Sequence, residues 1–181
     1  MKKIFTPLAL VFASSAAIAA PETGTINFYG TVTDAGPCPI EVVDPTTGIP
    51  SRVMLGHPRA SQFEQVGDHT TEARFALKIT PGGGCIIAPG TEVQVTFDSQ
   101  GGAIGPGNDL YRLMPGSADN LAVAIFDDSD TKLAPGTASM DYQVDEQVET
   151  MMPFSARYEA IGIPVTSGPA MANVGFTVSL P

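Results

Sequence analysis

Two short motifs in this sequence have residue types and spacing that could do chemistry. The glycine run at 82–84 could form a phosphate-binding loop, but the Gly-Lys-Ser/Thr end that holds phosphate does not follow it. The Asp-Asp-Ser-Asp run at 127–130 resembles the start of a calcium loop, but it lacks the glycine and the bidentate glutamate that complete such a loop. We therefore expect a glycine turn before Cys85 and a solvated hairpin turn at 127–130.

The other side chains that could serve catalysis or metal binding are isolated. His57 and His69 have no plausible nucleophile near them in the sequence, and the Gly-X-Ser-X-Gly nucleophile motif does not occur. The acidic residues of 145–149 are expected on an exposed face, and Met151 and Met152 in core or edge packing. The chain is therefore predicted to be a structural or binding protein, with no enzymatic activity, no cofactor and no metal.

The first 19 residues have the composition of a signal peptide. Lys2 and Lys3 give a positive start, 8–13 an apolar stretch, and 17–19 a small-residue cleavage site. A membrane anchor is the alternative, but the apolar stretch is too short to span a bilayer. We expect cleavage after Ala19, which leaves 162 of the 181 residues as an exported, soluble protein of single-domain size.

The mature chain is strongly acidic. Without Lys2 and Lys3, seven basic residues face 19 acidic ones, which gives a net charge of about −12. Nucleic-acid binding relies on lysine and arginine to neutralise phosphates, so this balance argues strongly against a nucleic-acid partner. The hydrophobic content of 43% is enough for a packed core.

Cys38 and Cys85 are the two cysteines of the chain. In an exported protein a single disulfide between them is the default expectation. A metal site is the competing interpretation, but the CxxC or HxxxH spacing of metal ligands is absent, and His57 and His69 stand apart from the cysteines and from each other.

Alternation of apolar and polar residues repeats along the chain and predicts short strands. The alternating segments are 53–57, 75–79, 93–97, 121–125, 154–158 and 176–180. Turns rich in glycine and proline separate them, for example at 81–84, 105–107 and 135–136. Short strands with this spacing are typical of an all-β sandwich.

The segment GTINFYGTV at 24–32 forms one more alternating strand, close behind the leader. Its apolar row consists of Ile26, Phe28, Gly30 and Val32, and the glycine in this row packs nothing. A strand with an apolar face at the start of the mature chain needs a sheet that accepts it.

Several segments together resemble the pilin subunits of type 1 fimbriae, which the chaperone–usher pathway assembles. They are GTINFYG (24–30), VMLGH (53–57), FALKITPGGGC (75–85), LAVAIFDD (121–128), PFSARYEA (153–160) and ANVGFTVSLP (172–181). The similarity covers essentially the whole mature chain, and the placement of Cys38 and Cys85 is also similar to that family. The family usually has a tyrosine next to last, whereas this chain has Leu180 followed by Pro181.

The resemblance implies an incomplete immunoglobulin-like β-sandwich that lacks its last strand and is completed in trans. The strand at 175–181, with Phe176, Val178 and Leu180 on its apolar face, then borders an open groove. A periplasmic chaperone fills this groove during export through the periplasm, and an outer-membrane usher assembles the subunits. The family function is that of a structural subunit of a fimbria on the bacterial surface, which supports cell adhesion.

The resemblance also gives the N-terminal strand a purpose. Ile26, Phe28, Gly30 and Val32 are expected to enter the groove of a neighbouring pilin subunit by strand addition, with Gly30 at a shallow point that admits no side chain. The expected organisation is a signal peptide at 1–19, a donor-strand extension at 20–34 and a pilin domain at 35–181. The alternative is a self-contained secreted β-sandwich that binds a glycan or other ligand and closes its own sheet.

Overall fold

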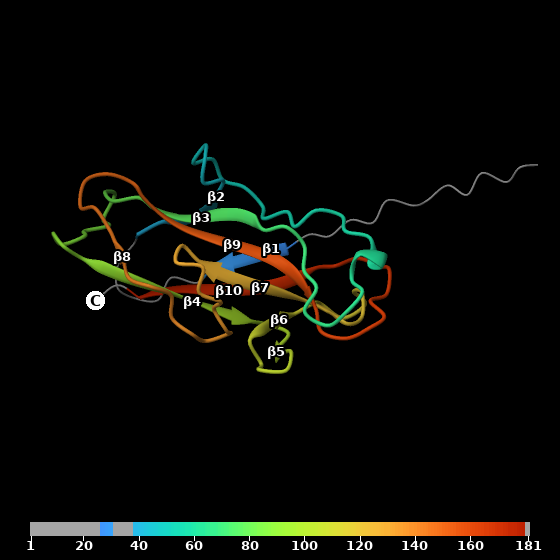
Figure 1. Ribbon diagram of the computed structural model, residues 1–181. Coiled ribbons are helices and arrows are strands. Elements are labelled where there is room, and N and C mark those ends of the chain that lie inside the picture. Colours follow the sequence, from blue (N-terminus) through green and yellow to red (C-terminus); the bar gives the residue numbers. More distant parts are fainter. Residues whose placement is uncertain (1–25, 31–37, 180–181) are drawn as a thin grey trace, which may run out of the picture.

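The computed structural model describes residues 26–30 and 38–179, which form ten β-strands and one 3-10 turn (Figure 1). The elements are β1 (Ile26–Gly30), β2 (Ile40–Val43), η1 (Ala60–Gln62), β3 (Ala73–Ile79), β4 (Glu92–Ser99), β5 (Ala103–Ile104), β6 (Leu110–Arg112), β7 (Leu121–Asp127), β8 (Tyr142–Gln143), β9 (Thr150–Ala160) and β10 (Ala172–Ser179). Within these two ranges no helix is long and apolar enough to cross a membrane. The prediction of an all-β fold is confirmed.

The strands form two sheets. One sheet has the order β1-β10-β4-β8, and the other has the order β2-β3-β9-β7-β6-β5. Neighbouring strands are antiparallel except for β1 and β10, which run parallel. Figure 1 shows β3 and β9 of the larger sheet on one side of the molecule and β4 and β10 of the smaller sheet on the other. The two sheets make the β-sandwich that the strand spacing predicts.

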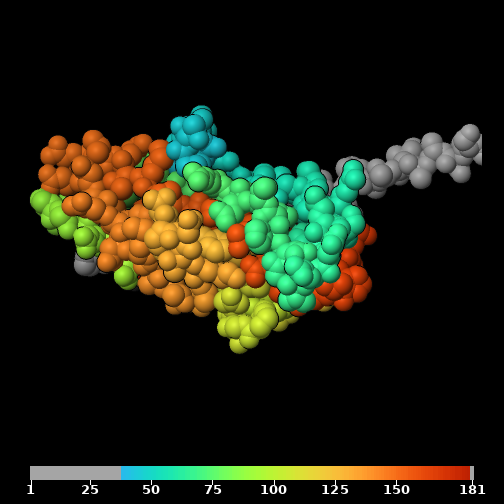
Figure 2. Space-filling model, viewed as in Figure 1, coloured from blue at the N-terminus to red at the C-terminus, as the bar shows by residue number. Residues whose placement is uncertain are grey.

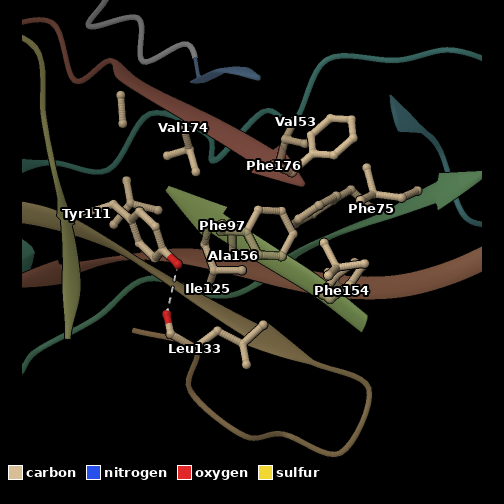
Figure 3. Close-up of a cluster of buried hydrophobic side chains, with 14 of the residues drawn as sticks. Val53, Phe75, Phe97, Tyr111, Ile125, Leu133, Phe154, Ala156, Val174 and Phe176 are labelled. Carbon is tan, nitrogen blue, oxygen red and sulfur yellow. Dashed lines mark hydrogen bonds between the residues drawn. The ribbon is translucent and has the colours of Figure 1, made fainter. Parts of the chain in front are cut away.

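A cluster of aromatic side chains joins the two sheets at the centre of the core (Figure 3). Phe75 and Phe154 of the larger sheet stack with their ring centroids 5.7 Å apart, and Phe97 of the smaller sheet meets Phe154 edge-on at 5.0 Å. Such pairs stabilise a fold by about 0.5–1.5 kcal/mol beyond the area that they bury. The alternation at 75–79, 93–97 and 154–158 therefore identified the strands that supply the core.

Buried tyrosines place their hydroxyl groups against backbone carbonyls. Tyr111 donates to the carbonyl of Leu133 at 3.0 Å (Figure 3), and Tyr158 donates to the carbonyl of Ala170 at 2.6 Å. Burial raises the pKa of Tyr158 to about 12. Each bond satisfies two polar groups that would otherwise be buried without a partner, and each ties a strand to a connecting segment.

β7 is buried on both faces. Val123 and Ile125 point into the main core, while the intervening Ala122, Ala124 and Phe126 pack under Leu110 in a second apolar cluster. The short hairpin of β5 and β6 supplies the cover on this outer side. This is why the sequence of β7 is apolar at nearly every position.

Residues 53–57 do not form a strand, and that prediction is wrong. Val53 and Leu55 are buried as the alternation requires, but His57 is exposed and the segment has no ladder partner among the described residues. The alternation indicates only that one side of an extended segment contacts the core. A strand also needs a neighbour that offers a free edge, and β2 already pairs with β3 from Ala76 to Ile79.

Candidate strand-acceptor edge

β10 is the strand that the sequence places beside an open groove. Its residues alternate between buried and partly exposed positions, with Ala172, Val174, Phe176 and Val178 facing the core. On one side it pairs with β4 in an unbroken antiparallel register from Val174 to Ser179. We call the opposite side of β10 the acceptor edge. Of the predicted groove residues, Phe176 and Val178 lie on this strand as expected, and Leu180 lies outside the described residues.

The acceptor edge is partly occupied by β1 of the same chain. β1 runs parallel to β10, with Ile26 paired with Ala172 and Gly30 paired with Phe176. The resemblance to pilins predicts that this strand joins a neighbour's sheet, whereas in the single chain it pairs with the chain's own β10. Among the described residues, β1 is the strand that pairs with this edge of β10. Val32, the last predicted donor residue, lies outside the described residues.

The register sets the predicted donor positions against the buried row of β10. Ile26, Phe28 and Gly30 pair in turn with Ala172, Val174 and Phe176. Gly30 is thus opposite the bulkiest side chain of that row, and Phe176 is only 4% exposed. Beyond Phe176, no described residue pairs with the acceptor edge, and the last three positions of β10 pair with β4 on the other side.

Cys38 and Cys85 form a disulfide, as predicted. The bond joins the residue just before β2 to the turn that follows β3, and both cysteines are buried. This turn begins at Gly82, whose N–H and carbonyl exchange hydrogen bonds of 3.0 Å with the backbone of Cys85. Because each sulfur is bonded to the other, the competing metal site on these cysteines is not formed. The disulfide therefore fastens the residue that precedes β2 to the end of the β3 turn.

Asp127 organises the hairpin turn at 127–130. One carboxylate oxygen accepts hydrogen bonds from the N–H groups of Ser129 and Thr131 at 3.0 and 3.1 Å, and the other accepts from the N–H of Met140 at 3.1 Å. Burial acts to raise the pKa of this carboxyl, but the hydrogen bonds outweigh burial and lower the pKa. The motif that resembled a calcium loop is a hairpin turn, as predicted, whose first aspartate is bonded within the protein.

A small apolar cavity lies where the loops carrying His57 and Val165 cover the core. Its lining includes Phe63, Leu121 and Tyr158, and its volume of about 20 Å³ suits about one water molecule. A sugar ring does not fit in such a space. This cavity therefore lends no support to the alternative of a glycan-binding sandwich.

Comparison with known proteins identifies the family. The model of the fimbrial protein family matches residues 26–180, a range that includes every described residue. The chain belongs to the fimbrial protein family. It is accordingly a structural subunit of a pilus that contacts other pilin subunits, exported through the periplasm and assembled on the cell surface.

Solved structures with the same fold agree with this assignment. The P pilus rod subunit PapA is 17% identical, with 80% of this chain and 99% of that chain covered and a TM-score of 0.60. A subunit from the structure of a chaperone–usher pilus is 21% identical, with 92% and 100% covered and a TM-score of 0.57. An antigen and type I fimbria protein of Burkholderia pseudomallei is 25% identical, with 87% and 91% covered and a TM-score of 0.52.

Proposed function

We propose that this fimbrial protein is a non-enzymatic subunit that polymerises by inserting residues of its N-terminal segment into a neighbour's acceptor edge. The donor residues are Ile26, Phe28, Gly30 and Val32, and Phe176, Val178 and Leu180 belong to the strand that receives them. The observation that supports the proposal is the pairing of β1 with β10 within one chain, because it sets Ile26, Phe28 and Gly30 against the buried row of β10.

The energetics favour occupation of the acceptor edge. Burial of an apolar side chain such as Ile26, Phe28 or Val32 contributes about 1.5–3 kcal/mol, and the main-chain hydrogen bonds add to that. An edge with unpaired N–H and carbonyl groups next to an apolar row is also prone to aggregation. The edge therefore needs a cover before assembly. A periplasmic chaperone would provide this cover, and an outer-membrane usher would exchange the chaperone for a neighbour's strand.

A neighbour's strand has an advantage over the chain's own. The chain's own strand is connected to Cys38 through the seven residues 31–37, and its described part, Ile26–Gly30, pairs with β10 as far as Phe176. A strand from another subunit is free of that connection, so it can extend over Val178 as well. We expect the polymer to replace the short pairing within one chain by a longer pairing between chains.

The pairing of β1 within its own sheet is also what a self-contained sandwich would show. Family membership favours the pilus subunit, and the proposed organisation remains a signal peptide at 1–19, a donor segment at 20–34 and a pilin domain at 35–181. The two functions differ in one measurable property. A self-contained sandwich stays monomeric at high concentration, whereas a pilus subunit forms polymers.

Deletion of residues 20–34 behind an intact signal peptide tests the proposal. We expect the truncated subunit to bind a chaperone and to accept a synthetic peptide of residues 24–32, but not to donate to a neighbour. Native mass spectrometry would show one peptide per subunit and no polymers. A matched peptide in which the order of the nine residues is scrambled serves as the control. Polymers of the truncated subunit, or equal binding of the scrambled peptide, would contradict the proposal.

A further inference from the structure

The cations of this acidic chain fall into two groups. Lys78, Lys132 and Arg157 each lie within 4.0 Å of a carboxylate, for example Arg157 at 2.9 Å from Glu72. Four exposed arginines have no such partner among the described residues, and they are Arg52, Arg59, Arg74 and Arg112. In a chain with a net charge of −10, an unpaired exposed cation is a natural contact for a second copy of the chain.

Two of these arginines line one groove beside β3. β2 pairs with β3 only from Ala76 to Ile79, so the first residues of β3 lie beyond the end of β2. There the extended segment 51–54 and β3 enclose a groove of about 250 Å³, which Arg52 and Arg74 line together with the half-exposed Met54. We call this the arginine groove. It is cationic and partly apolar.

The one carboxylate that lines the arginine groove is already engaged. Asp44 accepts hydrogen bonds of 2.9 Å from the N–H groups of Thr46 and Thr47, which lower the pKa of its carboxyl. Asp44 therefore holds its own turn together and forms no ion pair with Arg52 or Arg74. The groove retains cationic groups that an external carboxylate can meet.

The loop at 145–149 between β8 and β9 has the complementary chemistry. Asp145 accepts hydrogen bonds from the N–H groups of Gln147 and Val148 at 2.7 and 3.0 Å, which folds the loop into a tight turn. Glu146 is exposed with no cation partner among the described residues, and Val148 beside it is 60% exposed. The loop thus offers a carboxylate and an apolar side chain to a groove that has cations and a methionine.

We propose that the arginine groove of one subunit binds the 145–149 loop of another copy of this chain. Figure 2 shows the turn after β2 (cyan, top) and the region around 145–149 (orange, left end) as separate projections of the surface. A contact between two different surfaces of identical chains repeats from copy to copy, and it builds an open, helical assembly when the rotation between copies does not close into a ring. The proposal rests on the proposed function and adds to it a second contact, one that does not involve the acceptor edge.

A cross-linking experiment on purified fibres tests the contact directly. Arg74→Lys keeps the positive charge and introduces an amine that a carbodiimide joins to a touching carboxylate. We expect a link between positions 74 and 146, found by mass spectrometry in species of dimer size and lost in Arg74→Lys/Glu146→Gln. Arg112→Lys is the matched control and should give no link to 145–149. Three outcomes would overturn the proposal. They are links from position 74 only to carboxylates outside 145–149, no link at all, and a link found only in monomer-sized species.

Charge reversal supplies the functional test. We expect Arg52→Glu/Arg74→Glu to lower the ratio of surface fibres to periplasmic subunit–chaperone complex, and the addition of Glu146→Arg to restore part of it. Arg112→Glu should leave the ratio unchanged. An unchanged ratio in the double variant, or no recovery with Glu146→Arg, would overturn the proposal. Subunit pairs joined by a donor strand are counted apart from the fibre ratio. If the unsubstituted protein forms no such pairs, the proposed function is overturned rather than the contact of the arginine groove.

Discussion

Gly30 illustrates how a single residue can depend on the strand beside it. In the sequence it interrupts an apolar row, and within its own strand it contributes no packing. In the structure it is paired with the buried Phe176, the bulkiest residue of the apolar row of β10. A glycine at this position lets the backbone of the inserted strand lie close to β10.

Gly30→Val is expected to impair fibre growth and to leave the subunit–chaperone complex near its normal level. The added side chain must displace core atoms of the neighbour, which costs on the order of 1–3 kcal/mol. In the proposed pathway a chaperone would supply its own strand, so the complex should not depend on position 30. The measurement is the amount of periplasmic complex and of surface fibres in one strain.

Two outcomes of that measurement would contradict the donor role. Loss of both complex and fibres would show that Gly30 is a bend within the subunit's own fold. Normal fibres would show that position 30 tolerates a side chain. Thr31→Val, at the neighbouring position outside the apolar row, is the matched control.

Asp127→Ala should destabilise the subunit by on the order of 3 kcal/mol, because it leaves the N–H groups of Ser129, Thr131 and Met140 without their acceptor. The pKa of Asp127 is lowered in the folded state, so its contribution is present above the ordinary value of 3.8 and is lost as the pH falls below it. Urea unfolding between pH 7 and pH 3 measures both effects. The variant should lose less stability on acidification than the unsubstituted protein. Equal losses would contradict the role of the Asp127 carboxylate in the pH dependence of stability.

At the scale of elements, the long strands could be predicted from the sequence and the short ones could not. The alternation at 75–79, 93–97, 121–125 and 154–158 marks strands that each place one row of side chains in the main core. β5 and β8 have two residues each, too few for a period to be visible. The error at 53–57 has a different cause, since Val53 and Leu55 are buried in an extended segment that has no pairing edge.

Deletion of residues 175–181 should abolish stable accumulation of the subunit in the periplasm. The deletion removes Phe176 and Val178 from the core and with them the edge on which a chaperone would pair. The measurement is the amount of subunit that co-purifies with its chaperone. Deletion of Leu180 and Pro181 alone is the control with a smaller loss. Normal levels of the subunit that lacks residues 175–181 would refute the role of β10.

Cys38→Ser should lower both the stability and the periplasmic level of the subunit. The disulfide spans 47 positions, and closure of a loop of this length is worth roughly 4 kcal/mol in the chain-entropy model. Thiol alkylation and mass spectrometry of the unsubstituted protein should find no free thiol. Cys85→Ser should match Cys38→Ser in unfolding experiments, and a clear difference between them would indicate a separate role for one cysteine.

At the scale of the whole molecule, the resemblance to pilins predicts an open edge on β10 and a neighbour's strand as its occupant, whereas the single chain pairs this edge with its own β1. The sequence shows two alternating apolar rows, one with Phe176 and Val178 and the other with Ile26, Phe28 and Gly30. The resemblance to pilins implies that one row packs beside the other. Whether the strand pairs within its own chain or with another depends on whether a second subunit is present. That is a property of concentration and assembly, so a single sequence does not determine it.

The position of the disulfide has a mechanical consequence. In the proposed fibre, each donor strand is held in a neighbouring subunit. Tension passes from that strand along its own chain to Cys38, the residue just before β2. Without the bond to Cys85, that pull would fall on β2, whose four residues could peel away from β3 one pair at a time. The covalent link carries the load past β2 into the turn after β3, so the sandwich resists force as one body. Reduced fibres should therefore lengthen under a pull that leaves oxidised fibres intact.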